Sequence, residues 1–242
     1  HLRPRRQRQM CIRDRFTALV SATTGLSPAV IHHQLELVAE TLRDLARGAD
    51  GAEPSPVRGL AVVLPSNAIA VNRAWLPALV CRARVALKPG ASDPFTPHRI
   101  IAALISAGFP ADNFSVYPSS HEATGVLIGL WPRVQLFGDS EVVARYGDNP
   151  NVQVNGPGKS AVVLGAQVEL AAVLDEVAEG ITLHEGRSCL NTSAVVTLGG
   201  PEVAHALAAG LADRLHQCPP IGLANAERAR AVASFLTDAL SH

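Results

Sequence analysis

Cys189 is the residue of this sequence best suited to act as a nucleophile. It lies in HEGRSCLNTS (184–193), after a short polar run and before the apolar stretch AVVTLGG (194–200). A lone cysteine is most often a small, buried hydrophobic residue. A nucleophilic cysteine needs a lowered thiol pKa and donors for an oxyanion, and a helix beginning near Arg187 would supply both. The local sequence leaves the buried and the nucleophilic interpretations open.

The spacing of the cysteines argues against a metal site and against a disulfide framework. The four cysteines are Cys11, Cys81, Cys189 and Cys218, far apart in the chain and without a CxxC pair. His184, the histidine nearest to Cys189, has no second ligand at metal-binding spacing. We therefore expect no metal and a reducing, cytoplasmic setting.

A Gly-Lys-Ser sequence in NGPGKSAVVL (155–164) invites comparison with a phosphate-binding loop. That loop requires a glycine five positions before Gly158, where Gln153 stands, and a helix after it. The following AVVLG is instead typical of a strand. The sequence also lacks a GxGxxG run after its first expected strand, so the usual dinucleotide fingerprint is absent.

The nearest substitute for a pyrophosphate site is FGDSEVVARY (137–146), where a strand is expected to end at Gly138 and a helix to follow. The free N–H groups of the first helical turn could receive a pyrophosphate. Alternatively, Asp139 caps this helix with its own side chain.

The composition is that of an ordinary globular protein. The chain has 242 residues, of which 48% are hydrophobic and 17% charged, with 21 basic and 21 acidic side chains. This balance provides no general attraction to nucleic acid. Since no apolar run reaches about 18 residues, we expect no membrane span.

The elements that would position these residues alternate between strand and helix. An amphipathic helix is expected over 28–47, ending at Gly48, and the pattern after it predicts βαβ units, hence an α/β fold with a Rossmann-like parallel sheet. The expected strands are 59–65, 84–89, 114–118, 133–138, 151–158, 160–165 and 194–200, and the expected helices are 68–83, 94–108, 120–131, 167–183, 201–216 and one from about Ala224.

Ligands of open parallel sheets bind at the carboxyl ends of the strands. Three loops with polar residues or glycines follow expected strands here: Pro65-Ser66-Asn67, Lys88-Pro89-Gly90 and Gly138-Asp139-Ser140. We expect a nucleotide site at this edge.

Taken together, five segments resemble the aldehyde dehydrogenase superfamily in order and spacing over residues 57 to about 200. They are VRGLAVVLPSNA (57–68), VALKPGASDPFTP (85–97), VQLFGDSEV (134–142), NGPGKSAVVL (155–164) and HEGRSCLNTSAVV (184–196). The separation of 34 positions between Asn155 and Cys189 also suits that family. The resemblance implies a cofactor domain of the aldehyde dehydrogenase kind, followed by the start of a second α/β catalytic domain.

The resemblance implies a role for each matching residue. Cys189 would attack the substrate carbonyl, and Asn67 would donate its amide to the oxyanion. Lys88 would hold the adenosine ribose of NAD or NADP, and Gly138 and Ser140 would lie beside the pyrophosphate.

Three departures from the family pattern affect the predicted reaction or the cofactor contact. Asn155 stands where hydrolytic members carry the glutamate that activates water, and an amide cannot act as a general base. We therefore favour an acyl-CoA reductase-like reaction with coenzyme A as co-substrate, while hydrolysis to a carboxylic acid and a non-catalytic binding protein remain alternatives. Val143 replaces a glycine of the family, and Asp139 adds a negative charge, so the cofactor contact also differs.

The predicted organisation has four parts. Residues 1–15, HLRPRRQRQMCIRDR, are rich in arginine and are expected to be non-native or disordered. An N-terminal helix and linker (16–56), a nucleotide-binding domain (57–184) and a partial catalytic domain (185–242) follow. We expect the chain to be a fragment that turns over poorly by itself, and the full-length protein to be a homo-oligomer acting on a small aldehyde or acyl-CoA.

Overall fold

A computed structural model describes residues 5–49, 58–218, 229–230, 233–234 and 237. The chain divides into two compact units. The first comprises residues 1–156 with 223–242, and the second comprises residues 157–222. In the described residues, no helix is long and apolar enough to cross a membrane.

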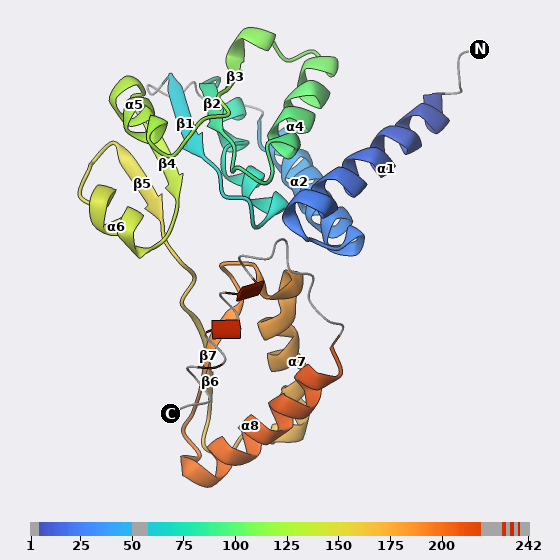
Figure 1. Ribbon diagram of the computed structural model, residues 1–242, viewed down its shortest axis with the longest axis vertical. Helices are drawn as coiled ribbons and strands as arrows, with labels where there is room; N and C mark the ends of the chain where they lie inside the picture. The colour runs from blue at the N-terminus through green and yellow to red at the C-terminus, as the bar shows by residue number, and fades with distance from the viewer. Residues whose placement is uncertain (1–4, 50–57, 219–228, 231–232, 235–236, 238–242) are drawn as a thin grey trace. The chain divides into compact units, whose positions relative to one another are not determined.

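The first unit is built on a five-stranded parallel sheet (Figure 1). Its strands are β1 (Gly59–Val63), β2 (Arg84–Lys88), β3 (Phe114–Val116), β4 (Val134–Phe137) and β5 (Val152–Asn155). Their order is β3-β2-β1-β4-β5, so the chain proceeds to one side of β1 and then returns to the other. This reversal places a topological switch point between β1 and β4, where open α/β sheets bind ligands. The parallel α/β fold predicted from the sequence is confirmed.

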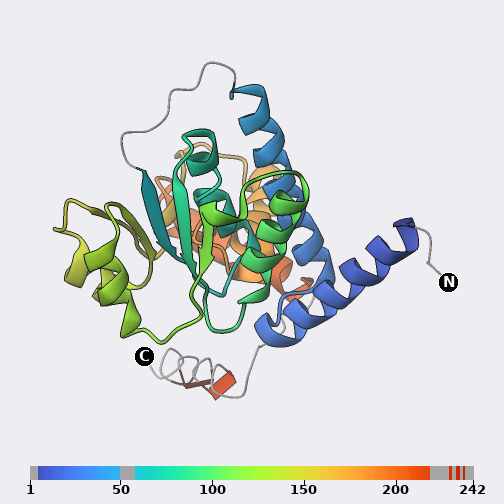
Figure 2. The ribbon, with the colours of Figure 1, turned by 90° about the horizontal axis from the view of Figure 1, so that it is seen from above.

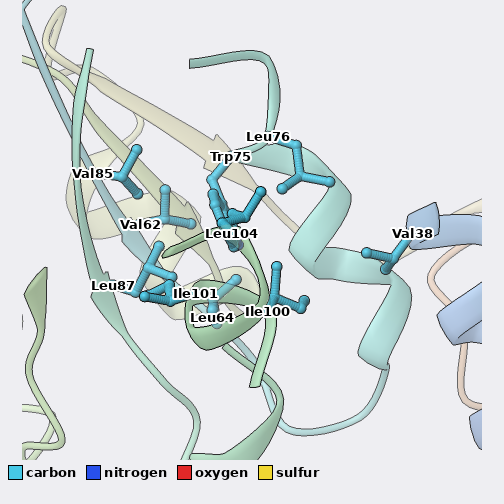
Figure 3. Packing of buried hydrophobic residues seen from close by; sticks show 10 residues of the cluster. All are labelled: Val38, Val62, Leu64, Trp75, Leu76, Val85, Leu87, Ile100, Ile101 and Leu104. Carbon is cyan, nitrogen blue, oxygen red and sulfur yellow. The ribbon is translucent and has the colours of Figure 1, made fainter. Parts of the chain in front are cut away.

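Helices cover both faces of this sheet, because neighbouring residues of each strand point to opposite sides. Val62 and Leu87 face a cluster with Trp75, Leu76 and residues of α2 (Pro28–Arg47) and α4 (Phe95–Ser106), shown in Figure 3. Ala61 and Val63 face a second cluster with residues of α5 (Ala123–Leu130) and α6 (Ser140–Tyr146). Figure 2 shows α2 (blue) on one side of the strands and α5 and α6 (yellow-green) on the other.

Two helical segments of the first unit show how local residues determine where a helix begins and ends. The predicted helix over 28–47 is confirmed as α2, in which Ser27 Oγ accepts a hydrogen bond from the N–H of Val30 at 3.3 Å. The predicted helix over 68–83 is instead the 3₁₀ helix η1 (Ile69–Ala74) and the short α3 (Pro77–Val80). Pro77 separates them because it has no N–H to continue a helix.

The N-terminal segment is helical from its fifth residue. Helix α1 (Arg5–Thr24) is anchored by Phe16 and Val20, which pack in a cluster with Leu26 and Ile31. The structure thus differs from the expected disorder for residues 5–15, because they form the first turns of a helix whose later turns are packed. The remaining short element of this unit is η2 (Ala111–Asn113).

The second unit pairs two parallel strands, β6 (Ser160–Leu164) and β7 (Thr192–Thr197). Helices α7 (Leu170–Thr182) and α8 (Gly200–His216) pack against each other, and η3 (Leu183–Gly186) follows α7. The predicted domain boundary at 184/185 differs from the division in the structure at 156/157, because β6 pairs with β7. The helix expected from about Ala224 lies almost wholly outside the described residues.

Candidate functional site

The loops after β1 and β2 pack tightly at the carboxyl edge of the sheet. The N–H of Leu64 donates to the carbonyl oxygen of Lys88 at 2.8 Å, and the N–H of Ser92 donates to Ser66 Oγ at 3.0 Å. A Cβ on Gly90 would overlap Ser66 Oγ and approach the carbonyl carbon of Pro65 to 2.7 Å. The glycine is therefore required for the close approach of the two loops at this edge.

Lys88 is the last residue of β2, and its side chain is only 4% exposed. Burial lowers the pKa of its ammonium group, because a charged amine loses solvation there. None of the residues that the structure describes forms an ion pair with it. A buried ammonium without a counter-ion is suited to oxygen atoms of a ligand, since each of its N–H groups requires an acceptor.

Asn67 is half-buried in the loop that connects β1 to η1. The segment after it is held by buried amide groups. Gln34 Oε1 of α2 accepts from the N–H of Ala70 at 3.0 Å, and Asn72 Oδ1 accepts from Trp75 Nε1 at 3.1 Å. Gln34 and Asn72 were not found by sequence reasoning, because a glutamine or an asparagine within an expected helix carries no pattern that reveals burial.

Asp139 caps α6 with its side chain. Its Oδ1 accepts hydrogen bonds from the N–H groups of Glu141 and Val142, both at 3.0 Å. Of the two interpretations of this loop, the structure supports the cap. The N–H groups of Glu141 and Val142 are therefore already paired, and a pyrophosphate on this first turn would have to compete with the carboxylate for them.

Two valines of α6 pack closely against glycines that follow β4 and β5. A Cβ on Gly138 would lie 2.6 Å from Cβ of Val142, and one on Gly156 would lie 2.8 Å from Cγ2 of Val143. Ser140 begins the helix and is exposed. Gly138 is thus required by the packing of α6 on the sheet, independently of any ligand.

Asn155 ends β5 and is tied to β4. Its Nδ2 donates to the carbonyl oxygen of Leu136 at 3.1 Å, and its own carbonyl accepts from the N–H of Gly138, also at 3.1 Å. The side-chain amide therefore acts as a donor to the sheet, a task that a carboxylate at this position could not perform.

Cys189 is exposed, which contradicts the interpretation as a buried thiol. It lies in a turn between η3 and β7, where Ser188 Oγ accepts from the N–H of Leu190 at 3.2 Å. The helix expected near Arg187 is absent: residues 187–191 form turns, and β7 begins at Thr192. The expectation was wrong because, after η3, the chain enters these turns and then β7, so no helix begins at Arg187.

Asn191 fixes the cysteine turn to the end of α7. Its Nδ2 donates to the carbonyl oxygens of Gly180, Ile181 and Leu183 at 3.3, 2.8 and 2.7 Å. These are carbonyls that the end of a helix leaves without partners. The sequence indicated Asn191 only through its position, two residues after the candidate nucleophile Cys189.

The backbone around Cys189 is also restricted by Gly158, His184 and Glu185. A Cβ on Gly158 would overlap the backbone carbonyl of Cys189. His184 and Glu185 adopt left-handed conformations with φ of 51° and 59°. Such backbone costs about 1 kcal/mol or more for each residue with a side chain. The tertiary structure of the second unit therefore imposes the shape of this turn.

The predicted site residues are divided between the two units. Asn67, Lys88, Gly138 and Ser140 all lie at or just beyond the carboxyl ends of β1, β2 and β4 in the first unit, as the sequence predicted. Cys189 belongs to the second unit. Within the described residues, no group of three or more metal-binding side chains occurs.

Three comparisons with known proteins bear on this arrangement. Residues 55–228 match the model of the aldehyde dehydrogenase family. Aldehyde dehydrogenase 1A1 of Oryctolagus cuniculus is 26% identical over 149 residues, which are 57% of this chain and 30% of that protein. The human protein of the same name is 24% identical over 151 residues, 58% of this chain and 30% of its own length. The match thus spans about a third of these curated relatives.

Solved structures share the fold. The NAD-dependent aldehyde dehydrogenase of Sinorhizobium meliloti has a TM-score of 0.81 and 19% identity, covering 96% of this chain and 53% of that one. An oxidoreductase of Marinobacter aquaeolei has a TM-score of 0.81 and 16% identity, covering 95% and 55%. An aldehyde dehydrogenase of Mycobacterium tuberculosis complexed with NAD+ has a TM-score of 0.72 and 21% identity, covering 85% and 47%.

Proposed function

The chain belongs to the aldehyde dehydrogenase family, and on that premise we propose that it carries the cofactor-binding part and the nucleophile of an NAD(P)-dependent oxidoreductase. The substrate pair is an aldehyde and an acyl thioester. The observation that carries the proposal is the exposed Cys189 on a turn restrained by Asn191 and Gly158. A restrained, exposed thiol is suited to attack on a carbonyl, whereas a buried thiol is inert.

In the aldehyde-oxidising direction, the Cys189 thiolate bonds to the carbonyl carbon, and the carbonyl oxygen becomes an oxyanion. The Cys189 backbone N–H would donate to that oxygen, and the Asn67 amide is the second donor that the family resemblance implies. When bound, NAD(P)+ supplies the hydride acceptor that converts the thiohemiacetal to a thioester. A second thiol then bonds to the acyl carbon and releases Cys189.

The carboxyl edge of the sheet fits a dinucleotide in part. Lys88 would donate to ribose hydroxyls, because its buried ammonium has no ion-pair partner among the described residues. Gly138 and Ser140 would lie beside the cofactor. Its pyrophosphate must avoid the first turn of α6, where Asp139 occupies the donors. Two of the structural neighbours are described as NAD-dependent or complexed with NAD+, which supports this cofactor class.

We infer coenzyme A as the acyl acceptor from Asn155. Its amide donates to the backbone of β4 and has no proton-accepting group that titrates near neutral pH. Water requires such a base to attack a thioester efficiently, whereas the thiol of coenzyme A is a better nucleophile at neutral pH. Hydrolysis to a free acid is the alternative reaction, and a non-catalytic binding role is the alternative class.

The proposal is tested by acylation of the 242-residue chain with an acyl-CoA, followed by intact mass. One acyl group is expected on the wild-type chain and none on Cys189→Ala. Cys218→Ala is the matched control, since it removes a half-buried thiol of the same unit and is expected to keep the label. Labelling of Cys189→Ala to the same extent as the wild-type chain would refute the assignment of Cys189 as the nucleophile.

The acyl acceptor is tested on the same labelled chain. The thioester is expected to persist in buffer and to be discharged by added coenzyme A. Asn155→Glu is expected to hydrolyse it faster, by roughly 100-fold if the carboxylate reaches water. If the wild-type thioester hydrolyses as fast in buffer as coenzyme A discharges it, the hydrolytic alternative holds.

The cofactor site is tested by calorimetric titration with NADH and NADPH. Lys88→Met keeps the buried apolar stem and removes the charge, and it is expected to weaken binding about tenfold. Lys159→Met, at an exposed lysine, is the control. Absence of binding by the wild-type chain, together with an unreactive Cys189, would favour the non-catalytic role.

A further inference from the structure

A hollow of about 570 Å³ lies at the amino ends of the strands, opposite to the carboxyl edge of the sheet. Its lining residues are Arg58, Gly59, Arg82, Arg84, Asn113, Leu130, Trp131 and Pro132. The volume is in the range of small-molecule sites. Among these described residues there are three arginines and no acidic side chain, so the hollow has a net positive charge that the proposed function does not use.

The sheet itself brings the basic residues together. The N–H of Arg84 donates to the carbonyl oxygen of Arg58 at 2.9 Å, so these residues are neighbours at the starts of β2 and β1. Asn113 directly precedes β3, the next strand. All three guanidinium groups belong to exposed residues, and within the described chain none forms an ion pair or a hydrogen bond through its side chain.

Arg82 stands where glycine is normally required. It follows the last turn of α3, with its N–H donating to the carbonyl of Leu79 at 3.1 Å and the N–H of Ala83 donating to that of Ala78 at 2.9 Å. This is the hydrogen-bond pattern of a Schellman motif, whose left-handed residue is usually glycine. Arg82 has φ of 54°. An arginine at a left-handed position is less favourable than glycine, which suggests that its side chain has a function.

An apolar wall completes the hollow. A Cβ on Gly59 would lie 3.0 Å from Cε3 and Cζ3 of Trp131, so the absent side chain lets the indole ring lie against the start of β1. Leu130, 73% exposed, and Pro132 flank this ring. The wall could contact the uncharged part of a ligand whose anionic part faces the arginines.

We propose that this hollow binds the phosphate group of a small phosphorylated molecule. A carboxylate is satisfied by one guanidinium fork, whereas a phosphate has three terminal oxygens that accept charge-assisted hydrogen bonds from several directions. Arginines on two strands and after α3, with the Asn113 amide on the third strand, provide donors of that distribution. The site is separate from the carboxyl edge, and its test does not depend on aldehyde chemistry.

The test uses inorganic pyrophosphate with the 242-residue chain, with thermal unfolding and calorimetric titration as readouts. Pyrophosphate is expected to raise the melting temperature of the wild-type chain, and Arg58→Gln/Arg84→Gln to weaken binding at least about tenfold. Arg43→Gln, which removes an exposed arginine of α2, is the matched control and is expected to bind like the wild type. Binding is also expected to weaken with added salt.

Arg82→Gly distinguishes a ligand site from a purely structural one. Glycine relieves the left-handed backbone, so this variant is expected to melt at a higher temperature than the wild type while binding pyrophosphate less tightly. The proposal is overturned if pyrophosphate fails to stabilise the wild-type chain at millimolar concentration, or if the arginine variants bind it unchanged. Equal stabilisation by citrate would also overturn it, because the site would then recognise carboxylates.

Discussion

The two units of this chain differ in how completely each buries its sheet. In the first unit, helices cover both faces of five parallel strands, and β1 and β2 contribute alternate residues to two clusters. In the second unit, β6 and β7 form a two-stranded parallel sheet whose exposed valines include Val163 and Val196, at 64% and 47% exposure. Parallel strands are normally buried on both faces.

The difference shows that the units depend on different kinds of interaction. Large hydrophobic residues hold the first unit together, including Trp75 and Leu87 with no exposed surface. Among its described residues, the second unit has few buried hydrophobic residues, namely Leu164, Val177, Ala178 and Leu207. There, hydrogen bonds from Asn191 and close backbone packing at Gly158 carry more of the local order. The candidate nucleophile thus lies in the less well packed unit.

The largest expected difference in the free energy of unfolding is between substitutions of two leucines, one in each unit. Leu87→Ala in β2 removes a fully buried side chain and is expected to lower the free energy of unfolding by roughly 3–4 kcal/mol. Leu198→Ala, just after β7, removes a side chain that is 65% exposed and is expected to change it by less than about 0.5 kcal/mol. Urea unfolding monitored by circular dichroism measures both. A large loss at Leu198 would show that the second unit buries this residue.

A glycine pair tests the backbone packing of the second unit. Gly158→Ala places a Cβ on the backbone of Cys189, which must move, and we expect a loss of about 2–3 kcal/mol with altered Cys189 reactivity. Gly165→Ala has no atom within 4 Å of the new Cβ and is expected to be near neutral. Thiol labelling rates and thermal melts compare them. Identical behaviour of the two variants would contradict the proposed restraint.

Asn191→Ala tests the side-chain contribution to the cysteine turn. Loss of three hydrogen bonds to the end of α7 leaves carbonyl groups without a protein partner, and we expect a cost of about 1–2 kcal/mol. Hydrogen exchange should increase in α7 and in the turn, with the five-stranded sheet unchanged. Equal acceleration in both units would show that the two units unfold together.

Asp139→Ala is the corresponding test in the first unit. It removes the N-cap of α6 and is expected to cost about 1 kcal/mol, which a thermal melt detects. If Asp139 also keeps a pyrophosphate away from this turn, the variant should bind NADH no more weakly than the wild type. Weaker binding by Asp139→Ala would indicate that the carboxylate contacts the cofactor directly.

The smallest expected effect is the pH dependence of Asp93. Burial raises the pKa of this carboxyl group above 3.8, and Asp93 Oδ1 accepts from the N–H of Thr96 at 3.0 Å. The folded state therefore binds the proton more tightly than the unfolded state, so stability is lost as pH rises through the folded pKa. Compared with Asp93→Asn, the wild type should gain stability as pH falls from neutral toward 4. Urea unfolding at several pH values checks the sign.

Local patterns in the sequence determined much of the first unit. Apolar runs between turn residues located β1, β2 and β4, because a strand buried on both faces is almost continuously hydrophobic. Apolar residues at helical spacing and the end at Gly48 located α2. The residues at the carboxyl edge followed from this order, since parallel strands present their ends to one side of the sheet.

What the sequence by itself determined was the parallel α/β order and the candidate residues Asn67, Lys88 and Cys189, because their signals are local runs and order along the chain. Only the tertiary structure decided that Asp139 caps α6, that β6 pairs with β7 across the predicted boundary, and that the cysteine turn lacks a helix. Each depends on contacts between segments far apart in the chain or on competition for the same backbone donors. A local pattern does not contain the partners that settle such competition.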